Sequence, residues 1–216
     1  MELSDVFPPF GLVVRAGALE MRGITDDLLV GICELAERGI HDPDEMPFYF
    51  PWSTAPAGEL ARNTAAYHWS VRAGFRPDDF RLELAVLWDG ELVGCQGVSA
   101  TGFPVTRSGE TGSWLGREFQ GRGIGTTMRR AMCALLFDHL GFEEVTSAAF
   151  VDNPASLAVS RKVGYLPNGT LRLVRREGEL ALNQVLLLTP DRFDRGDVAV
   201  EVSGADAVRS FIGLPG

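Results

Sequence analysis

The sequence predicts an α+β fold, with a mixed, mostly antiparallel sheet of about seven strands flanked by helices. A tight turn at Asp89-Gly90 joins two apolar segments, which is typical of an antiparallel hairpin. Amphipathic helical segments separate the later strands, and strand–helix–strand units pair their strands in parallel. No repeat or linker divides the chain. We therefore expect one domain over 1–216, with a core at about 18–190 and a C-terminal extension at 191–216.

The first third of the chain predicts two strands and two helices. The first strand candidates are Leu12–Arg15 and Ala18–Arg22. Thr25 is a good N-cap, and the apolar residues that follow it recur at helical spacing. This helix should end near Gly39, and a second helix should cover Gly58 to Ala73.

The middle of the chain predicts a hairpin, a strand and a long helix. The hairpin strands are Phe80–Trp88 and Glu91–Ser99, and Glu110–Arg117 is a further strand. In the helix from Ile124 to Leu140, the apolar residues fall on one face. We expect Arg129, Arg130 and Asp138 to lie off that face.

The last third predicts a strand at Val145–Val151 and a short helix at Pro154–Val163. Asn153 is the expected N-cap of that helix, with Pro154 in its first position. Two final strands, Thr170–Arg176 and Leu180–Leu188, flank a turn.

Composition narrows the range of partners. The formal net charge is −9, which disfavours nucleic acid and anionic membranes, because both attract basic proteins. The longest uncharged stretch, Leu92 to Thr106, is shorter than the about 20 residues that a spanning helix needs. Cys33, Cys95 and Cys133 are far apart and form no metal-binding pattern with the histidines. We expect a cytoplasmic protein with reduced thiols and no metal.

A glycine-rich loop, Gln120-Gly121-Arg122-Gly123-Ile124-Gly125-Thr126, joins a strand directly to an amphipathic helix. Glycines leave backbone N–H groups uncovered, and a helix N-terminus attracts anions, so the loop suits a pyrophosphate. It matches neither the Walker loop nor the G-x-G-x-x-G dinucleotide fingerprint. A glycine-rich helix start that binds nothing remains the alternative.

The motif Gln120-x-x-Gly123-x-Gly125 resembles the acyl-CoA pyrophosphate motif of the GNAT superfamily of N-acyltransferases. Asn153-x-x-Ser156, followed by Lys162-x-Gly164-Tyr165, resembles the second signature of that family. The string W-L-G-x-x-x-Q-G-x-G-I-G-T is close to the RimJ/RimL-like branch. The expected order of strands and helices matches that fold from about residue 18 to 190.

The resemblance implies a cofactor, acetyl-CoA or another acyl-CoA such as succinyl-CoA, and a set of residues that hold it. The strand around Trp114, Leu115 and Gly116 would pair with the pantetheine arm through its backbone. Amides from Arg122 to Thr126 would hold the pyrophosphate, and Asn153 would contact the cofactor near the thioester. The full set of cofactor-binding residues is Trp114, Leu115, Gln120, Gly121, Arg122, Gly123, Ile124, Gly125, Thr126, Asn153 and Ser156.

The resemblance also suggests catalytic residues. Glu110 stands where the branch commonly has a glutamate proposed as base, although an exposed strand-end carboxylate is an equal alternative. Many family members have a tyrosine acid seven residues after the asparagine, but here that position is Ser160. Asn153, Ser156 and Ser160 fall on one helical stripe, so Ser156 is the better candidate for contacting the thiol, ahead of Ser160. A solvated polar stripe is the other interpretation.

The segment 41–53 is the candidate acceptor site, because it carries carboxylates and more apolar surface than a free loop should expose. His41, Asp42, Asp44 and Glu45 could orient a cationic amine; a packed loop without substrate contact is the alternative. The segment resembles a subgroup whose members use acyl donors larger than acetyl, succinyl included.

Two functions remain open at this stage. The first is an N-acyltransferase that moves an acyl group, acetyl first and succinyl as an option, to a primary amine by direct transfer in a ternary complex. The second is a non-catalytic acyl-CoA-binding or sensing module on the same fold. The expected partner is an amine-bearing small molecule or a protein N-terminus or lysine, with a homodimer as an option.

Overall fold

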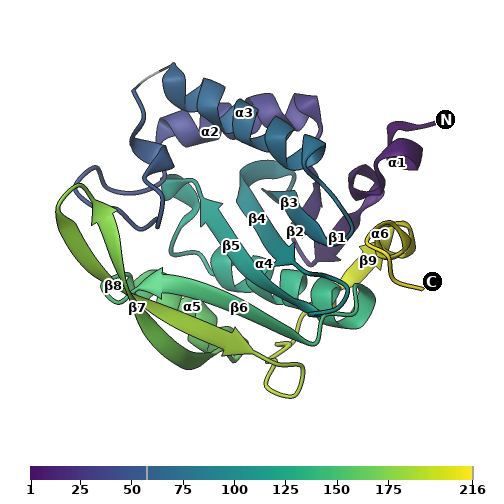
Figure 1. Ribbon diagram of the computed structural model, residues 1–216. Helices are drawn as coiled ribbons and strands as arrows, with labels where there is room; N and C mark the ends of the chain where they lie inside the picture. The colour runs from purple at the N-terminus through teal and green to yellow at the C-terminus, as the bar shows by residue number, and fades with distance from the viewer. Residues whose placement is uncertain (57, 216) are drawn as a thin grey trace.

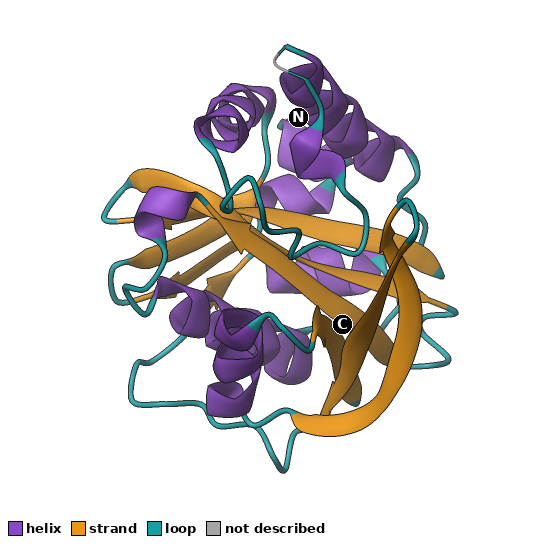
Figure 2. Cartoon of the chain, turned by 90° about the vertical axis from the view of Figure 1, so that its left-hand side faces the viewer, coloured by secondary structure: helices purple, strands orange, loops and turns teal. Residues whose placement is uncertain are grey.

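The computed structural model describes residues 1–56 and 58–215. Its centre is one nine-stranded sheet in the order β7-β8-β6-β5-β4-β3-β2-β1-β9, with helices on both faces (Figures 1 and 2). The strands are β1 Val13–Ala16, β2 Leu19–Gly23, β3 Asp79–Trp88, β4 Glu91–Thr101, β5 Ser108–Leu115, β6 Glu144–Phe150, β7 Leu166–Arg176, β8 Glu179–Leu188 and β9 Glu201–Ser203. The helices are α1 Leu3–Val6, α2 Asp26–Arg38, α3 Glu59–Ala73, α4 Ile124–Ala134, α5 Pro154–Val163 and α6 Ala205–Phe211.

The α+β class and the mostly antiparallel mixed sheet are confirmed, but the expected number of about seven strands is wrong. The ninth strand, β9, comes from the C-terminal segment, which shows no periodic pattern of apolar residues. It pairs antiparallel with β1, with Val202 opposite Val14. Val208 of α6 and Ile212, which follows that helix, are completely buried. Within residues 191–215, the chain therefore contributes a strand and core side chains.

The chain termini meet in an aromatic cluster, which the sequence did not predict. Phe7 lies 5.5 Å from Phe75 and 5.8 Å from Phe211, measured between ring centroids. Phe75 also stacks on Phe211 at 5.1 Å. Edge-to-face and stacked aromatic pairs of this kind contribute about 0.5–1.5 kcal/mol each beyond their buried area. They attach both termini to the end of α3.

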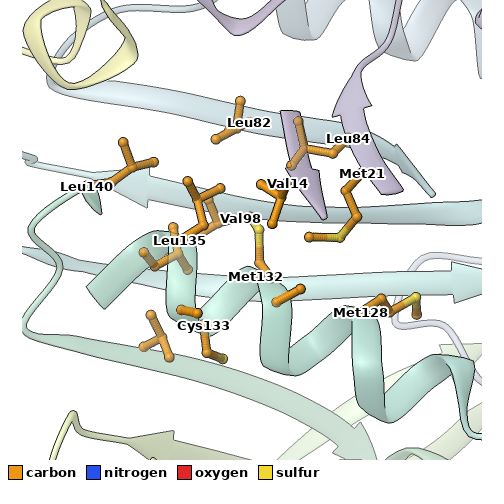
Figure 3. Packing of buried hydrophobic residues seen from close by; sticks show 14 of the residues in the cluster. Val14, Met21, Leu82, Leu84, Val98, Met128, Met132, Cys133, Leu135 and Leu140 are labelled. Carbon is orange, nitrogen blue, oxygen red and sulfur yellow. The ribbon is translucent and has the colours of Figure 1, made fainter. Parts of the chain in front are cut away.

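One face of the sheet is covered by α4, whose apolar side chains form the larger core. Met128, Met132, Cys133 and Leu135 all point into this core, next to side chains of β1 to β4 (Figure 3). α4 ends at Ala134 and continues as one π-helical turn, Leu135–His139, within the range predicted as a single helix.

The prediction that Arg129 lies off the buried face of α4 is wrong. Its side chain is buried and points at the sheet, whereas Arg130 is partly exposed. The helical pattern of the sequence assigns a charged residue such as Arg129 to the solvent side of the helix. It contains no information about the hydrogen-bond acceptors on the strands that α4 packs against. Arg129 belongs to the site described below.

The other face is covered by α2 and α3, which pack against each other and against the sheet through Ile32, Ala85 and Cys95 (Figure 2). No helix in the described part of the chain is both long and apolar enough to cross a membrane.

Strands β5 and β6 are the parallel neighbours in the sheet, and they diverge. Their pairing covers only Ser108–Glu110 against Glu144–Thr146. Beyond these residues β5 remains paired with β4 as far as Leu115, and β6 with β8 as far as Phe150 (Figure 1). The part of β5 that follows Glu110 therefore has an edge that is not paired with β6.

Candidate active site

The loop Gln120–Thr126, which we call the glycine loop, connects β5 to α4 and presents an open concave backbone. Gly121 and Gly123 have φ of +74° and +84°, the left-handed region that favours glycine. A Cβ at either residue would have no neighbouring atom within 4 Å, so space for a ligand lies beside the backbone. Gly123 is the N-cap of α4. The loop thus places exposed amides at the N-terminus of an eleven-residue helix.

Individual residues of the glycine loop have different tasks. Gln120 is structural: its side-chain amide donates to the carbonyls of Ile40 at 2.6 Å and Leu115 at 3.0 Å. The Thr126 N–H donates to the Gly123 carbonyl at 3.0 Å, which leaves Ile124 and Gly125 as the first-turn amides suited to an anion. Arg122 is exposed beside them, over the ring of Phe119. These residues fit a pyrophosphate.

Strand β5 supplies the unpaired edge next to this loop. Trp114 and Leu115 lie on the part of β5 that has left β6. The Trp114 ring packs below the 41–53 segment, 5.7 Å from the Trp52 ring, and Leu115 is buried. The β5 edge at these two residues offers backbone groups to a ligand, as the pantetheine hypothesis requires.

Arg129 lies between the diverging strands and was missed by the sequence analysis. It donates to the Ser113 hydroxyl of β5 and the Ser147 hydroxyl of β6, each at 3.0 Å. Its other acceptors are Gln96 Oε1 at 3.4 Å and Thr111 Oγ1 at 3.3 Å. All four acceptors are oxygens of neutral side chains. Removing the Arg129 side chain would leave these buried oxygens without their donor, which lowers the free energy of unfolding. Arg129 therefore connects β5 to β6 where their backbone pairing stops.

Helix α5 carries the three residues expected near the thioester. Asn153 is its N-cap, as predicted, and accepts the Ser156 N–H at 3.0 Å. Ser156 is partly buried, whereas Ser160 is 1% exposed. The Ser160 hydroxyl has no hydrogen-bond partner within the described residues. Ser160 thus faces the protein interior, whereas Asn153 and Ser156 are partly exposed.

On the opposite face of the sheet, strands β3, β4 and β5 form an open surface centred on a glycine. Glu83, Gly97 and Gly112 lie side by side in register and on the same face. A Cβ at Gly97 would collide with the Glu83 carboxylate, whereas a Cβ at Gly112 would meet no atom within 4 Å. Glu110 is two residues from Gly112 on the same face of β5 and is exposed. We call Tyr67, Glu83, Gly97, Glu110 and Gly112 the Gly112 surface.

Glu83 is the perturbed acid of this surface. The Tyr67 hydroxyl donates to its Oε1 at 2.8 Å. Burial raises the pKa of Glu83 from its ordinary 4.5 to about 7, although the Tyr67 hydrogen bond and the nearby Arg81 charge oppose the change. The sequence analysis singled out neither Tyr67 nor Glu83 as a functional residue. The sequence did contain a signal for this site: Glu83 lies within an apolar strand, and the partner strand of the hairpin carries a glycine opposite it.

The segment 41–53 packs onto α2 and α3, with Met46 buried and Phe48 next to Trp52. The His41 Nδ1–H donates to the Asp42 carbonyl at 2.8 Å, and the Ser53 hydroxyl lies 2.7 Å from Nε2. His41 therefore holds the loop together.

The acidic residues of this segment differ in their surroundings. Asp42 forms an ion pair with Arg117 at 3.0 Å, so its carboxylate is already engaged. Asp44 and Glu45 are exposed, and Arg176 of β7 donates to the Asp44 carbonyl oxygen at 3.2 Å. The segment thus connects the end of β7 to the loop after β5.

No group of three or more His, Cys, Asp or Glu side chains in the described residues is arranged to hold a metal ion. Strand β5 brings together an anion-binding loop and an unpaired strand edge, with carboxylates on the opposite face of the sheet.

The family comparison agrees with this site. The model of the acetyltransferase (GNAT) domain matches residues 19–166, so the chain belongs to the GNAT acetyltransferase family. A curated relative from Bacillus subtilis (strain 168), named "Putative ribosomal N-acetyltransferase YdaF", is 34% identical over 91 residues, which is 42% of this chain. The chain spans about half the length of that relative.

Solved structures with low sequence identity share the fold. The Mycobacterium smegmatis RimJ structure, in complex with a CoA disulfide, has a TM-score of 0.72 at 17% identity. It covers 94% of this chain and 95% of its own. The RimL ribosomal L7/L12 alpha-N-protein acetyltransferase, in complex with coenzyme A, has a TM-score of 0.64 at 17% identity, over 82% of this chain and 96% of its own.

Proposed function

We propose that this protein transfers an acyl group, acetyl first, from acyl-CoA to a primary amine. The observation that carries the proposal is the unpaired edge of β5 beyond Glu110, which leads directly into the glycine loop at the N-terminus of α4. The loop amides and Arg122 would hold the pyrophosphate, and the β5 edge would pair with the pantetheine arm.

We propose direct transfer in a ternary complex, because the Gly112 surface lies on the same segment of β5 as the unpaired edge. An amine on this surface and an acyl group along the edge would meet without a covalent enzyme intermediate. Holding two reactants in such an orientation supplies much of the rate of a bimolecular reaction.

The preferred acceptor in this proposal is a protein N-terminal amine. The similar proteins support it, since they include a putative ribosomal N-acetyltransferase and an L7/L12 alpha-N-protein acetyltransferase. The exposed carboxylates of Asp44, Glu45 and Glu110 would favour a protonated amine of any kind, so lysine and small polyamines belong to the same test.

Calorimetry and a thiol-release assay test the proposal together. We expect acetyl-CoA to bind, and free CoA to appear only when a peptide with a free N-terminal serine, an N-acetylated lysine peptide or spermidine is added. Succinyl-CoA, assayed in parallel, decides whether the larger donor is used. Binding of acyl-CoA without thiol release, with a broad amine panel, would favour the non-catalytic module, in line with the buried Ser160 in place of a tyrosine.

A homodimer through the edge strand β7 is part of the proposal. Leu171 and Val174 are 51% and 69% exposed on this strand, and a second copy could cover them. Light scattering of the wild type and of Leu171→Lys gives the oligomeric state. We also propose a cytoplasmic location, which suits free cysteines and an acyl-CoA substrate.

A further inference from the structure

The Gly112 surface has a feature that the family motifs do not account for. Glu83 lies in the middle of β3 and belongs neither to the glycine loop nor to the 41–53 segment. It is paired with Gly97 of β4, which is paired in turn with Gly112 of β5, so all three residues are on the same face of the sheet. Neighbouring strands are about 4.8 Å apart. A group seated over Gly112 would therefore be within reach of the Glu83 carboxylate on one side and the unpaired edge of β5 on the other.

The surroundings hold the Glu83 carboxylate in that position. The carboxylate lies over Gly97, where a larger residue would displace it, and Tyr67 of α3 donates to it at 2.8 Å. Gly112 has open space above it. The sheet therefore provides a fixed carboxylate next to an empty site.

We propose that Glu83 is the proton acceptor for the amine and that Tyr67 is its positioning residue. This inference rests on the proposed acyltransferase function and deepens it. Glu110 is the other carboxylate beside Gly112, but it is exposed to water, whereas Glu83 is partly buried and tied to Tyr67.

The proton and electron balance of the step is complete with these groups. The ammonium group loses one proton to Glu83, which passes it to water. The nitrogen lone pair then forms the new C–N bond, and the C–S bond breaks with its electron pair remaining on sulfur. The second proton lost from nitrogen ends on that sulfur. The products are an amide, a CoA thiol and one proton in solution.

The pKa of Glu83, about 7, suits this role, because a general base works best when its pKa is near the working pH. The charged or titratable groups around Glu83 are Tyr67, His68 and Arg72 from α3, Arg81 on β3, Cys95 on β4 and Glu110 on β5. Burial lowers the pKa of His68 to about 4, and burial raises the pKa values of Tyr67 and Cys95. At pH 6 to 8 these three groups are neutral, which leaves Glu83 to titrate.

The test compares Glu83→Gln with Glu110→Gln as the matched carboxylate control. Acetyl-CoA is the donor, and spermidine and a peptide with N-terminal serine are the acceptors, from pH 5.5 to 9. We expect the wild-type kcat/KM for the amine to rise with pH and to level off above an apparent pKa near 7. We call this rise the limb of the pH profile. Glu83→Gln should lose this limb and about 100-fold or more of the rate at pH 8, while acetyl-CoA affinity by calorimetry stays unchanged. Glu110→Gln should keep the limb.

Two further variants separate proton transfer from a structural role. Tyr67→Phe should move the limb to higher pH, because it removes a hydrogen bond that stabilises the carboxylate, and Glu83→Asp should restore part of the rate. Activity of Glu83→Gln within threefold of wild type with the limb in place, or loss of the limb in Glu110→Gln, would overturn the inference. A wild type that releases no thiol with either amine would overturn the proposed function itself.

Discussion

The glycine loop and the Gly112 surface are served by the same strand, β5, but they are assembled differently. The glycine loop consists of consecutive residues, Gln120–Thr126, and its anion-binding geometry is set by two glycines with positive φ and one helix N-terminus. The Gly112 surface gathers residues from α3, β3, β4 and β5. A local motif is sufficient to bind a group that is the same in every acyl-CoA, such as the pyrophosphate. An acceptor site must be assembled by the fold, and its specificity depends on distant residues.

The largest expected effect is on the local motif. Gly123→Asp should weaken acyl-CoA binding about 100-fold or more, which corresponds to about 2.7 kcal/mol. The aspartate places a negative charge at the pyrophosphate and a Cβ at a φ of +84°. Calorimetry measures the change.

Gly123→Asn is the matched control, because asparagine tolerates the left-handed conformation and carries no charge. It should bind several-fold better than Gly123→Asp. Undiminished CoA affinity in Gly123→Asp would remove the loop as the cofactor site.

The second prediction concerns the connection between the two regions. Arg129→Ala should lower the free energy of unfolding by about 2–4 kcal/mol, because it empties a buried volume and removes donors from Ser113 and Ser147. Arg130→Ala, one residue further on the same helix, loses an exposed ion pair with Asp194 and should cost less than about 1 kcal/mol. Urea denaturation compares them. Equal losses would mean that Arg129 does not hold β5 and β6 in place.

The third prediction tests α5, which packs against α4 next to the glycine loop. Ser156→Ala should lower kcat about 30-fold or more with little change in acyl-CoA affinity, since one well-aimed hydrogen bond to developing charge is worth about 2–4 kcal/mol. Steady-state kinetics and calorimetry separate the two effects. A kcat within about threefold of wild type, or under about 1 kcal/mol, would reduce Ser156 to a residue of the first turn of α5.

The smallest effect is expected in the 41–53 segment. Asp44→Asn and Glu45→Gln should each raise the KM for the amine several-fold and leave the KM for acyl-CoA nearly constant, because both carboxylates are exposed. Asp42→Asn should do less, since Arg117 already pairs with Asp42. Unchanged amine selectivity in all three variants, with intact folding, would make the segment purely structural.

Elements with strong local signals could be predicted from the sequence. The Asp89-Gly90 hairpin, α2 with its Thr25 N-cap, and α5 with Asn153 and Pro154 all appear where they were expected. The strand β9 could not be predicted, because three residues carry no usable period and their partner, β1, is almost 190 residues earlier. The α4 pattern located the helix correctly but misjudged Arg129, whose acceptors lie on other strands.

By itself, the sequence determined the α+β class, the glycine loop before α4 and the capped start of α5, because turn glycines, caps and helical periodicity act within a few residues. Only the tertiary structure decided what lies opposite these elements. It buried Arg129 between β5 and β6, turned Ser160 inward and engaged Asp42 with Arg117. It also placed the Glu83 carboxylate over Gly97, the residue between Glu83 and Gly112 in the sheet. The physical reason is that burial, register and pairing depend on residues far apart in the chain, and these decide which charges are retained and which pKa values change.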